Sequence, residues 1–458
     1  MRASLVRAGF ALSTTLLAVF LLAGQAQAVP SFAAQTGEPC SSCHIGAFGP
    51  QLTPLGQAFK IGGYTQTGGQ GIAASVPLSA MVLSSFTNTD ASQPEPPKPG
   101  FARNNNFVLD QISLFLAGRV TDNLGAFVQG TYSGTDRAFR LDNSDIRLTA
   151  PLTLKDSELR LGVSVNNGPT VQDPYNSIYA WIFPFASSAL APVPTAQPLL
   201  AGGLLGNSIG STVYAWYDRS LYLEAGVYNT YGPSLLSATG TTYGPGATAH
   251  PAPYARAAYE WNWNGQSAHI GTVFLHSDIN PATAARTATG AFGRNSYTDY
   301  AIDGGYQFLG DRTHIATADA IFTHETADLH GSTALGGSSQ KSSPLNQIRL
   351  NLTYYYKNTY GLTFGWQDTW GKANPLLYPS APVTGSANGK PNSNAFIFEA
   401  DWVPFGKADS WGAPFANLKV GLQYTMYTRF NGGTTNYDGF GRNASGNNTL
   451  FLYAWLEF

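Results

Sequence analysis

The sequence contains few charged residues for its length. Asp, Glu, Lys and Arg make up 11% of the 458 residues, and the formal net charge is −2. Proteins that bind nucleic acids usually carry clustered basic residues, so this composition argues against a nucleic-acid partner. After the N-terminus the chain also lacks any run of about 18 apolar residues, the minimum for a membrane-spanning helix. These two deficits exclude a nucleic-acid-binding protein and a helical membrane protein.

Cysteine is nearly absent. The chain has two cysteines, and both lie in the segment Cys40-Ser41-Ser42-Cys43-His44. This C-x-x-C-H pattern is typical of covalent c-type haem attachment, in which both thiols bond to the haem vinyl groups and the histidine binds the iron. We therefore predict one covalently bound haem c, held by Cys40 and Cys43, with His44 as an iron ligand.

Two other interpretations of this motif have less support. A disulfide or a thioredoxin-like redox pair would be expected in a βαβ context, whereas prolines and glycines flank the motif on both sides. A structural zinc site would need two more ligands, and the next histidine after His44 is His250. Neither alternative has a supporting feature nearby in the sequence.

The N-terminus has the features of a secretory signal peptide. Arg2 and Arg7 precede an apolar run over residues 8–23, and Ala26–Ala28 matches an A-x-A cleavage site. The run is too short for a spanning helix. We expect export from the cytoplasm, removal of residues 1–28 and a mature chain that begins near Val29.

The remaining chain shows the pattern of an all-β transmembrane barrel. It is rich in glycine, with 50 residues, and aromatic residues make up 13%. Apolar and polar residues alternate in segments 159–166, 347–357 and 418–429, as expected where one face meets lipid and the other a polar lumen. A soluble β-sandwich or propeller would bury its apolar face, and no blade-length repeat supports a propeller.

This alternation predicts about 16 antiparallel strands, an even number as bacterial barrels prefer. The predicted starts are Val76, Phe107, Leu124, Ala138, Glu158, Gly210, Leu221, Pro253, Ala268, Thr298, Thr313, Asn346, Leu362, Ala395, Leu418 and Thr449. Short turns alternate with long loops, and the chain ends on Phe458, similar to bacterial outer-membrane barrels. We expect short periplasmic turns, long extracellular loops and both barrel termini at the periplasmic side. Residues 29–72 then form the haem-binding segment and residues 73–458 the barrel.

A second iron ligand has one candidate among the methionines. After Met1, only Met81 and Met426 remain. Met426 falls on the apolar side of its predicted strand, whereas alternation turns Met81 toward the lumen with Ser79 and Ser85. Methionine ligation is common in c-type cytochromes and raises the reduction potential, so Met81 is the candidate. It could instead pack as an ordinary apolar residue, and the six later histidines are expected to be polar lumen or loop residues.

The wide lumen of a barrel this size offers space for the haem-binding segment as a plug. Five residues of the early strands fall on their polar faces: Gln111, Arg119, Asp145, Arg147 and Arg160. They either form a wall that holds the plug or are ordinary lumen residues. The long loop 167–208, with Trp181 and Phe183–Phe185, either folds inward as a constriction or forms an extracellular cap.

Several segments resemble the fused monohaem cytochrome–porins of iron-oxidising bacteria. Besides the haem motif, the resemblance rests on Pro30–Gly37, Pro54–Lys60, Asp110–Arg119, Leu141–Arg147 and Val165–Pro174. Members of that family carry a short N-terminal haem segment on a porin-like barrel in the outer membrane. The resemblance implies an oxidoreductase that accepts electrons from extracellular Fe(II) and passes them through one haem to a periplasmic cytochrome or another acceptor.

The chain also departs from this family, as a divergent branch would. The family usually has arginine where this chain has Ala34 and Gln57, and aromatic or glutamine residues where it has Ile45 and Gly46. Loss of two cations near a haem would alter its reduction potential. Two other functions therefore stay open: a haem electron carrier for another donor or acceptor, and a solute channel with a regulatory haem segment.

Overall fold

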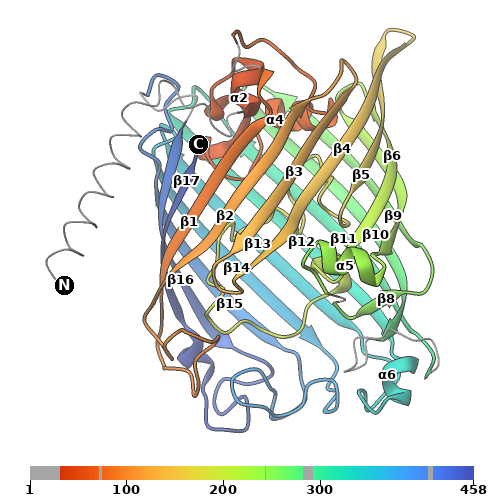
Figure 1. Cartoon of the computed structure of the whole chain (residues 1–458), viewed down its shortest axis with the longest axis vertical. Coiled ribbons are helices and arrows are strands. Elements are labelled where there is room, and N and C mark those ends of the chain that lie inside the picture. The colour runs from red at the N-terminus through yellow and green to blue at the C-terminus, as the bar shows by residue number, and fades with distance from the viewer. Residues whose placement is uncertain (1–30, 72–74, 243, 282–291, 411–415) are drawn as a thin grey trace, which may run out of the picture.

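In the computed structural model, seventeen strands form one antiparallel sheet, and sixteen of them close into a barrel (Figure 1). The structure describes residues 31–71, 75–242, 244–281, 292–410 and 416–458. Closure occurs where the first strand pairs with the last, in a register that joins Met81 to Glu457 and Thr89 to Thr449. The predicted signal peptide, residues 1–28, lies outside the described residues.

Neighbouring strands of the wall follow one another in the chain. The strands are β1 Leu78–Thr89, β2 Asn106–Arg119, β3 Leu124–Ser133, β4 Ala138–Leu154, β5 Ser157–Asn166, β6 Ser208–Tyr217, β7 Leu221–Thr230, β8 Gly246–Thr248, β9 Ala252–Trp263, β10 Gln266–Pro281, β11 Asn295–Phe308, β12 His314–Asp328, β13 Leu345–Tyr356, β14 Tyr360–Gly371, β15 Ser393–Trp402, β16 Asn417–Arg429 and β17 Thr449–Glu457. The short β8 pairs with β10, and β7 pairs directly with β9. The sixteen wall strands confirm the predicted number, and each predicted start lies within three residues of the observed one.

Alternating burial confirms the two faces of the wall. In β1, Ser79, Met81, Leu83 and Ser85 are buried toward the lumen, and the residues between them are more exposed. Leu114, Val213 and Leu362 illustrate the outer face, where their exposed fractions are 60%, 60% and 63%. Apolar residues on the outside and polar residues on the inside are the arrangement of a transmembrane barrel.

Two residues that alternation places on the lumen face lie elsewhere: Arg119 of the early strands, and Arg429 at the end of the alternating segment 418–429. Arg119 is the last residue of β2, and its exposed side chain pairs with Asp122 in the following turn. Arg429 is exposed at the end of β16, because a bulge at Thr428 shifts the register against β15. A bulge inserts one extra residue and reverses the faces beyond it, so strict alternation gave the wrong side for Arg429.

Most short turns gather at one end of the barrel and the long loops at the other, as predicted; the four-residue turn 134–137 between β3 and β4 lies at the long-loop end. The turn between β9 and β10 is Asn264-Gly265, with φ values of 45° and 73°. Positive φ at both central residues defines the type I′ turn that favours Asn-Gly in tight hairpins. The C-terminus lies at the short-turn end (Figure 1, upper end).

A helical plug, residues 31–71, occupies the short-turn end (Figure 1). It contains α2 Ser31–Thr36, α3 Cys40–Cys43, the 3-10 turn η1 Ile45–Ala47 and α4 Pro54–Ile61. Outside the plug, α5 Pro233–Ala238 and α6 His330–Ala334 lie in loops at the opposite end. Among the described residues, no helix is both long and apolar enough to cross a bilayer.

The loop between β5 and β6, residues 167–207, folds into the lumen, and we call it the inner loop. Its Tyr179 hydroxyl lies 2.8 Å from Thr323 Oγ1 on β12, and Gln423 on β16 donates to the Ala186 carbonyl at 3.1 Å. The segment therefore reaches the wall opposite its own strands. This geometry confirms the inward-folding alternative for the predicted loop and rules out a purely extracellular cap.

Candidate functional site

The C-x-x-C-H segment forms a compact turn at the centre of the plug. Cys40–Cys43 makes one helical turn, closed by the His44 amide donating to the Cys40 carbonyl at 2.9 Å. His44 then forms an isolated antiparallel bridge with Leu52. The Thr53 amide donates to the Cys43 carbonyl at 2.9 Å, and Thr53 caps α4. These contacts hold both cysteines and the histidine close to α4.

Hydrogen bonds tie this plug to strands around the whole barrel. Tyr64 donates to Asp145 on β4 at 2.7 Å, Gln51 donates to Asp319 on β12 at 2.7 Å, and Asn417 on β16 donates to the Ala47 carbonyl at 2.6 Å. Further anchors are Ser31 to Ala117, Arg119 backbone to Gln35, Gln307 to Leu52, and Tyr214 to Ile61. Since β2, β4, β6, β11, β12 and β16 all take part, the plug lies inside the barrel.

A cavity of about 690 Å³ lies against the motif. Cys40, Cys43 and His44 contribute to one side, and Met81 on β1 also lines it. Aromatic residues complete this part of the lining: Phe32, Phe48, Phe59, Phe115, Phe127 and Trp455. A largely apolar cavity in the range of about 300–1,000 Å³ is typical of sites for small molecules and cofactors.

The side chains of the motif suit the predicted haem. Both cysteines are free and only partly buried, so a disulfide does not occupy them. Burial raises the pKa of Cys40 to about 12 and that of Cys43 to about 11. Burial also lowers the pKa of His44 to about 4, so its imidazole is neutral at pH 7, the form that binds metals. Its buried Nδ1 has no hydrogen-bond partner among the described residues.

Zinc lacks a comparable set of ligands. No three His, Cys, Asp or Glu side chains in the part of the chain that the structure describes are grouped so that they could hold a metal ion. The donor set at the motif, two thiols and one imidazole beside an apolar cavity, instead matches the requirements of covalent haem attachment.

Met81 lies where the alternation places it. Its side chain is 3% exposed, and it packs in one apolar cluster with Phe115 and Ala117. Phe32 of the plug and Trp455 of β17 contact the same cluster. Met81 and His44 thus line the same cavity, while the packing alternative for Met81 is equally compatible with these contacts. Met426 lies on the opposite, outward-facing register of its strand.

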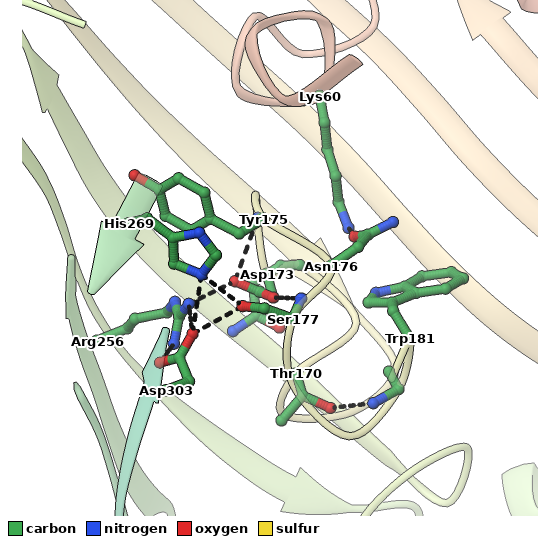
Figure 2. Close-up of polar contacts among 12 residues, drawn as sticks. Lys60, Thr170, Asp173, Tyr175, Asn176, Ser177, Trp181, Arg256, His269 and Asp303 are labelled. Atoms are coloured by element: carbon green, nitrogen blue, oxygen red, sulfur yellow. Dashed lines mark hydrogen bonds and ion pairs between the residues drawn. The ribbon is translucent and has the colours of Figure 1, made fainter. Parts of the chain in front are cut away.

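The inner loop closes over the plug (Figure 2). Lys60 of α4 donates from Nζ to the Val171 carbonyl and to Asn176 Oδ1, both at 2.8 Å. Asn176 donates in turn to the Pro50 carbonyl at 2.6 Å, and the Lys60 ammonium lies 4.8 Å from the centre of the Trp181 ring. The plug and the inner loop therefore form one interface within the lumen.

A buried ion-pair cluster fixes the inner loop to the wall (Figure 2). Arg256 on β9 contacts Asp173 of the loop at 3.0 Å and Asp303 on β11 at 2.9 Å, and all three side chains are fully buried. Ser177 donates to Asp303 at 2.7 Å and lies 3.2 Å from His269 Nε2. Because buried charges are stable only when paired, this cluster pins the loop at one position on the wall.

We expect the docking of the plug to depend on pH through Lys60. Burial lowers the pKa of Lys60 from 10.5 to about 7, and the charge of Arg147 acts in the same direction. Between about pH 7 and 10.5 the unfolded chain binds more protons, so stability rises with pH, by up to about 1.4 kcal/mol per pH unit. Urea unfolding at several pH values, with hydrogen exchange of the plug amides as the readout, measures how the free energy of unfolding of the plug changes with pH.

Lys60→Met should remove the slope, because methionine keeps the length of the chain without the charge. Lys155→Met is the matched control, since Lys155 is exposed in the turn between β4 and β5. An unchanged pH slope in Lys60→Met would contradict the assignment to this side chain.

The structure separates the five early polar residues. Asp145 and Arg147 form a buried pair, 2.7 Å apart, that contacts the plug through Tyr64 and the inner loop through Gln172. Gln111 lines the cavity. Arg160 pairs with Glu158 at 3.1 Å near the short-turn end. The side chains of Asp145 and Arg147 thus belong to a wall that holds the plug, whereas Arg119 contributes only its backbone amide.

The later histidines are more scattered than predicted. His269 faces the lumen, and His250 and His330 lie in loops. In contrast, His276, His314 and His324 lie on the outer register and contact Thr298, Tyr354 and Asn346. The prediction of lumen or loop positions is wrong for these three histidines. A polar side chain on the adjacent strand hydrogen-bonds to each imidazole, which can therefore face outward.

Sequence reasoning missed most of the buried charges of the later strands. Alternation in segment 418–429 correctly places Lys419 on the polar face, but not its partners on β15, Asp401 at 3.0 Å and Glu399 at 3.3 Å. Arg256 and Asp303 were not identified. Alternation could have placed each on a lumen face, since Arg256 stands between outward-facing alanines. Which of these charges pair follows from the register between the strands and from the path of the inner loop, and alternation gives neither.

Comparison with known proteins supports the fold. No protein-family model matches the chain, and no curated protein matches it. OprB of Pseudomonas putida is similar in structure, with a TM-score of 0.50 and 11% identity over 84% of this chain and 94% of that one. An anion-selective porin from Comamonas acidovorans has a TM-score of 0.44 and 12% identity, covering 83% and 98% of the two chains. The outer-membrane channel DcaP of Acinetobacter baumannii has a TM-score of 0.43 and 12% identity, covering 83% and 96%.

At this level of identity, the similarity to OprB shows a porin-type barrel fold and carries no information about ligands. The resemblance to the cytochrome–porins stays a prediction. It concerns chiefly the plug and the first strands, where the haem motif lies.

Proposed function

We propose that this protein is an outer-membrane oxidoreductase that holds one haem c in its lumen and moves single electrons from extracellular Fe(II) to a periplasmic carrier. The observation that carries the proposal is the position of Cys40, Cys43 and His44 on the wall of one cavity inside the barrel. Haem bound at such a site would supply the one-electron chemistry.

The chain's own residues would have three tasks. Cys40 and Cys43 would anchor the haem covalently, and the neutral imidazole of His44 would bind the iron. The aromatic lining, including Phe48 and Trp455 at a ring-centre distance of 5.1 Å, would limit access of water. The hydrogen bonds between plug and wall would keep the motif at a fixed depth, with Fe(II) approaching from the long-loop end.

The outer surface supports a membrane location. Besides the apolar outward residues, exposed aromatic side chains surround the short-turn end of β6, β9, β11, β13, β14 and β15: Tyr217, Trp261, Trp263, Tyr306, Phe308, Tyr354, Tyr356, Tyr360 and Trp402. Aromatic girdles mark the lipid–water interfaces of outer-membrane barrels. We place the short-turn end, with the plug and the C-terminus, in the periplasm, where an electron acceptor would dock.

The haem assignment is tested on the full chain produced in a host that matures haem c. Intact mass spectrometry should show the polypeptide with one added haem, located by peptide mapping to the segment 40–43. Dithionite should produce the sharp visible band of a reduced c-type haem. A haem-free mature barrel from such a host would contradict the proposal.

The role of Met81 is tested separately. If its thioether binds the iron, Met81→Ala should lower the reduction potential and change the visible spectrum of the oxidised protein. Met426→Ala is the matched control, because Met426 faces outward and should leave both unchanged. An unaltered spectrum and potential in Met81→Ala would show that Met81 only packs against the plug.

The same cavity supports a second candidate, a solute channel. Its lining continues from the motif to Thr369 and Ser393, at the long-loop ends of β14 and β15. A porin-type fold is compatible with solute passage past the plug. Single-channel conductance of the reconstituted full chain would favour this candidate, particularly if removal of the haem left conductance unchanged.

A further inference from the structure

Among the described residues, the fully buried cations of the lumen wall are paired with carboxylates, whereas Arg349, which is partly buried and also faces the lumen, is not. Arg147 pairs with Asp145, Arg256 pairs with Asp173 and Asp303, and Lys419 pairs with Glu399 and Asp401. Arg349 on β13 forms no such pair with any residue that the structure describes. A charged side chain within a protein usually has an opposite charge nearby, so Arg349 requires an explanation.

The contacts of Arg349 leave its guanidinium group available. Its Nε donates to Gln347 Oε1 at 3.2 Å, and its guanidinium carbon lies 5.3 Å from the centre of the Tyr179 ring. In the described part of the chain, neither terminal nitrogen of Arg349 has a hydrogen-bond partner. Neither is enclosed as a buried unpaired atom, so both are accessible from the lumen.

Arg349 lines the same cavity as the C-x-x-C-H motif. On this side the other polar lining residues are uncharged, and they lie beside the apolar Ala395 and Ile397: Gln347, Gln367, Thr369, Gln423, Thr425 and Tyr427. Gln347 also donates to Thr369 at 3.0 Å, which fixes the amide beside the guanidinium. The surroundings thus provide neutral hydrogen-bonding groups and one cation with two free donors.

We infer that Arg349 is the centre of a carboxylate-binding site in the lumen. A guanidinium group presents two parallel N–H donors that match the two oxygens of a carboxylate. The Tyr179 ring, over which the guanidinium carbon lies, and Gln347, which accepts from Nε, hold the group in position. The ligand is therefore a planar carboxylate anion that approaches the two terminal nitrogens.

This carboxylate has two possible sources. One is a small organic acid that enters from the long-loop end, and the other is a propionate of the haem proposed at the motif. The second source rests on the proposed function, whereas the first does not, because the site is formed by β13 and the inner loop. Both sources use the same chemistry at Arg349.

Acetate is a suitable probe, and saturation-transfer NMR measures its binding to the full-length barrel. In a haem-free Cys40→Ala/Cys43→Ala background, acetate should bind saturably. Arg349→Gln in that background should weaken binding by at least about tenfold, since a charge-assisted bidentate contact is lost. Arg349→Lys keeps the positive charge but loses the two parallel N–H donors of the guanidinium group. Its affinity for acetate should lie between that of the background and that of Arg349→Gln. Circular dichroism confirms folding of each variant.

Arg429→Gln is the matched control, because Arg429 is exposed outside the lumen and carries the same charge. It should bind acetate as the background does. If the haem-bearing wild type also binds acetate, the source is a free acid; if only the haem-free form binds it, a propionate occupies the site. Absent binding in the haem-free form, or equal binding in Arg349→Gln, would overturn the inference.

Absence of haem from the wild type would refute the proposed function and remove only the second source. The carboxylate site would then still be tested by the Arg349 variants, so the two failures are distinguishable.

Discussion

Replacing Cys40 and Cys43 together by alanine is expected to abolish covalent haem attachment and leave the barrel folded. Thioether bonds require the two thiols, and no other cysteine exists in the chain. Among the residues that the structure describes, neither thiol hydrogen-bonds to the wall, whereas the plug is held by Ser31, Gln51 and Tyr64. Haem-dependent peroxidase staining of a denaturing gel should fall from full intensity to background.

The control is Ser41→Ala/Ser42→Ala, which changes the two residues between the cysteines and keeps the thiols. It should retain staining at the wild-type level. Covalent haem in the double-cysteine variant, or equal loss in the serine variant, would contradict the assigned attachment site.

Replacing Arg256 by leucine is expected to release the inner loop from the wall. The substitution leaves the buried carboxylates of Asp173 and Asp303 side by side without their cation. Removing one partner of a buried ion pair typically costs about 3–5 kcal/mol. Hydrogen exchange should therefore accelerate by about two orders of magnitude or more at the Ser177 amide, which donates to Asp173 at 2.8 Å.

Arg160→Leu provides the comparison for Arg256→Leu. Arg160 is partly exposed, and it pairs with Glu158 at 3.1 Å. Pairs of this kind contribute about 0–1 kcal/mol, so exchange in the inner loop should stay near the wild-type rate. If Arg256→Leu also exchanged at the wild-type rate, the ion-pair cluster would not be what holds the loop.

The barrel could be predicted from the sequence because the pattern that defines each strand lies within a few consecutive residues. Lipid on one side and a polar lumen on the other impose a period of two on every strand, and Leu159–Asn166 shows that period in eight consecutive residues. The prediction was wrong at Arg429, where a bulge of a single residue reverses the faces. Alternation predicts which face of the sheet a residue occupies only where no bulge shifts the register of the strand.

The site was predictable in part. The motif Cys40–His44 and the lumen-facing position of Met81 depend on local sequence, and the structure places them around one cavity. The pairing of Arg256 with Asp173, which are 83 positions apart, depends on how far the inner loop reaches across the lumen. The isolation of Arg349 likewise follows from which side chains fail to reach it, and no local pattern contains that information.

The proposed function requires that extracellular Fe(II) reduce a haem held inside this barrel. The most direct test is the visible spectrum of the haem-bearing full chain before and after anaerobic addition of Fe(II). We predict the sharp absorption band of reduced c-type haem, at an intensity approaching that obtained with dithionite. A band that dithionite produces and Fe(II) does not would contradict ferrous iron as the electron donor.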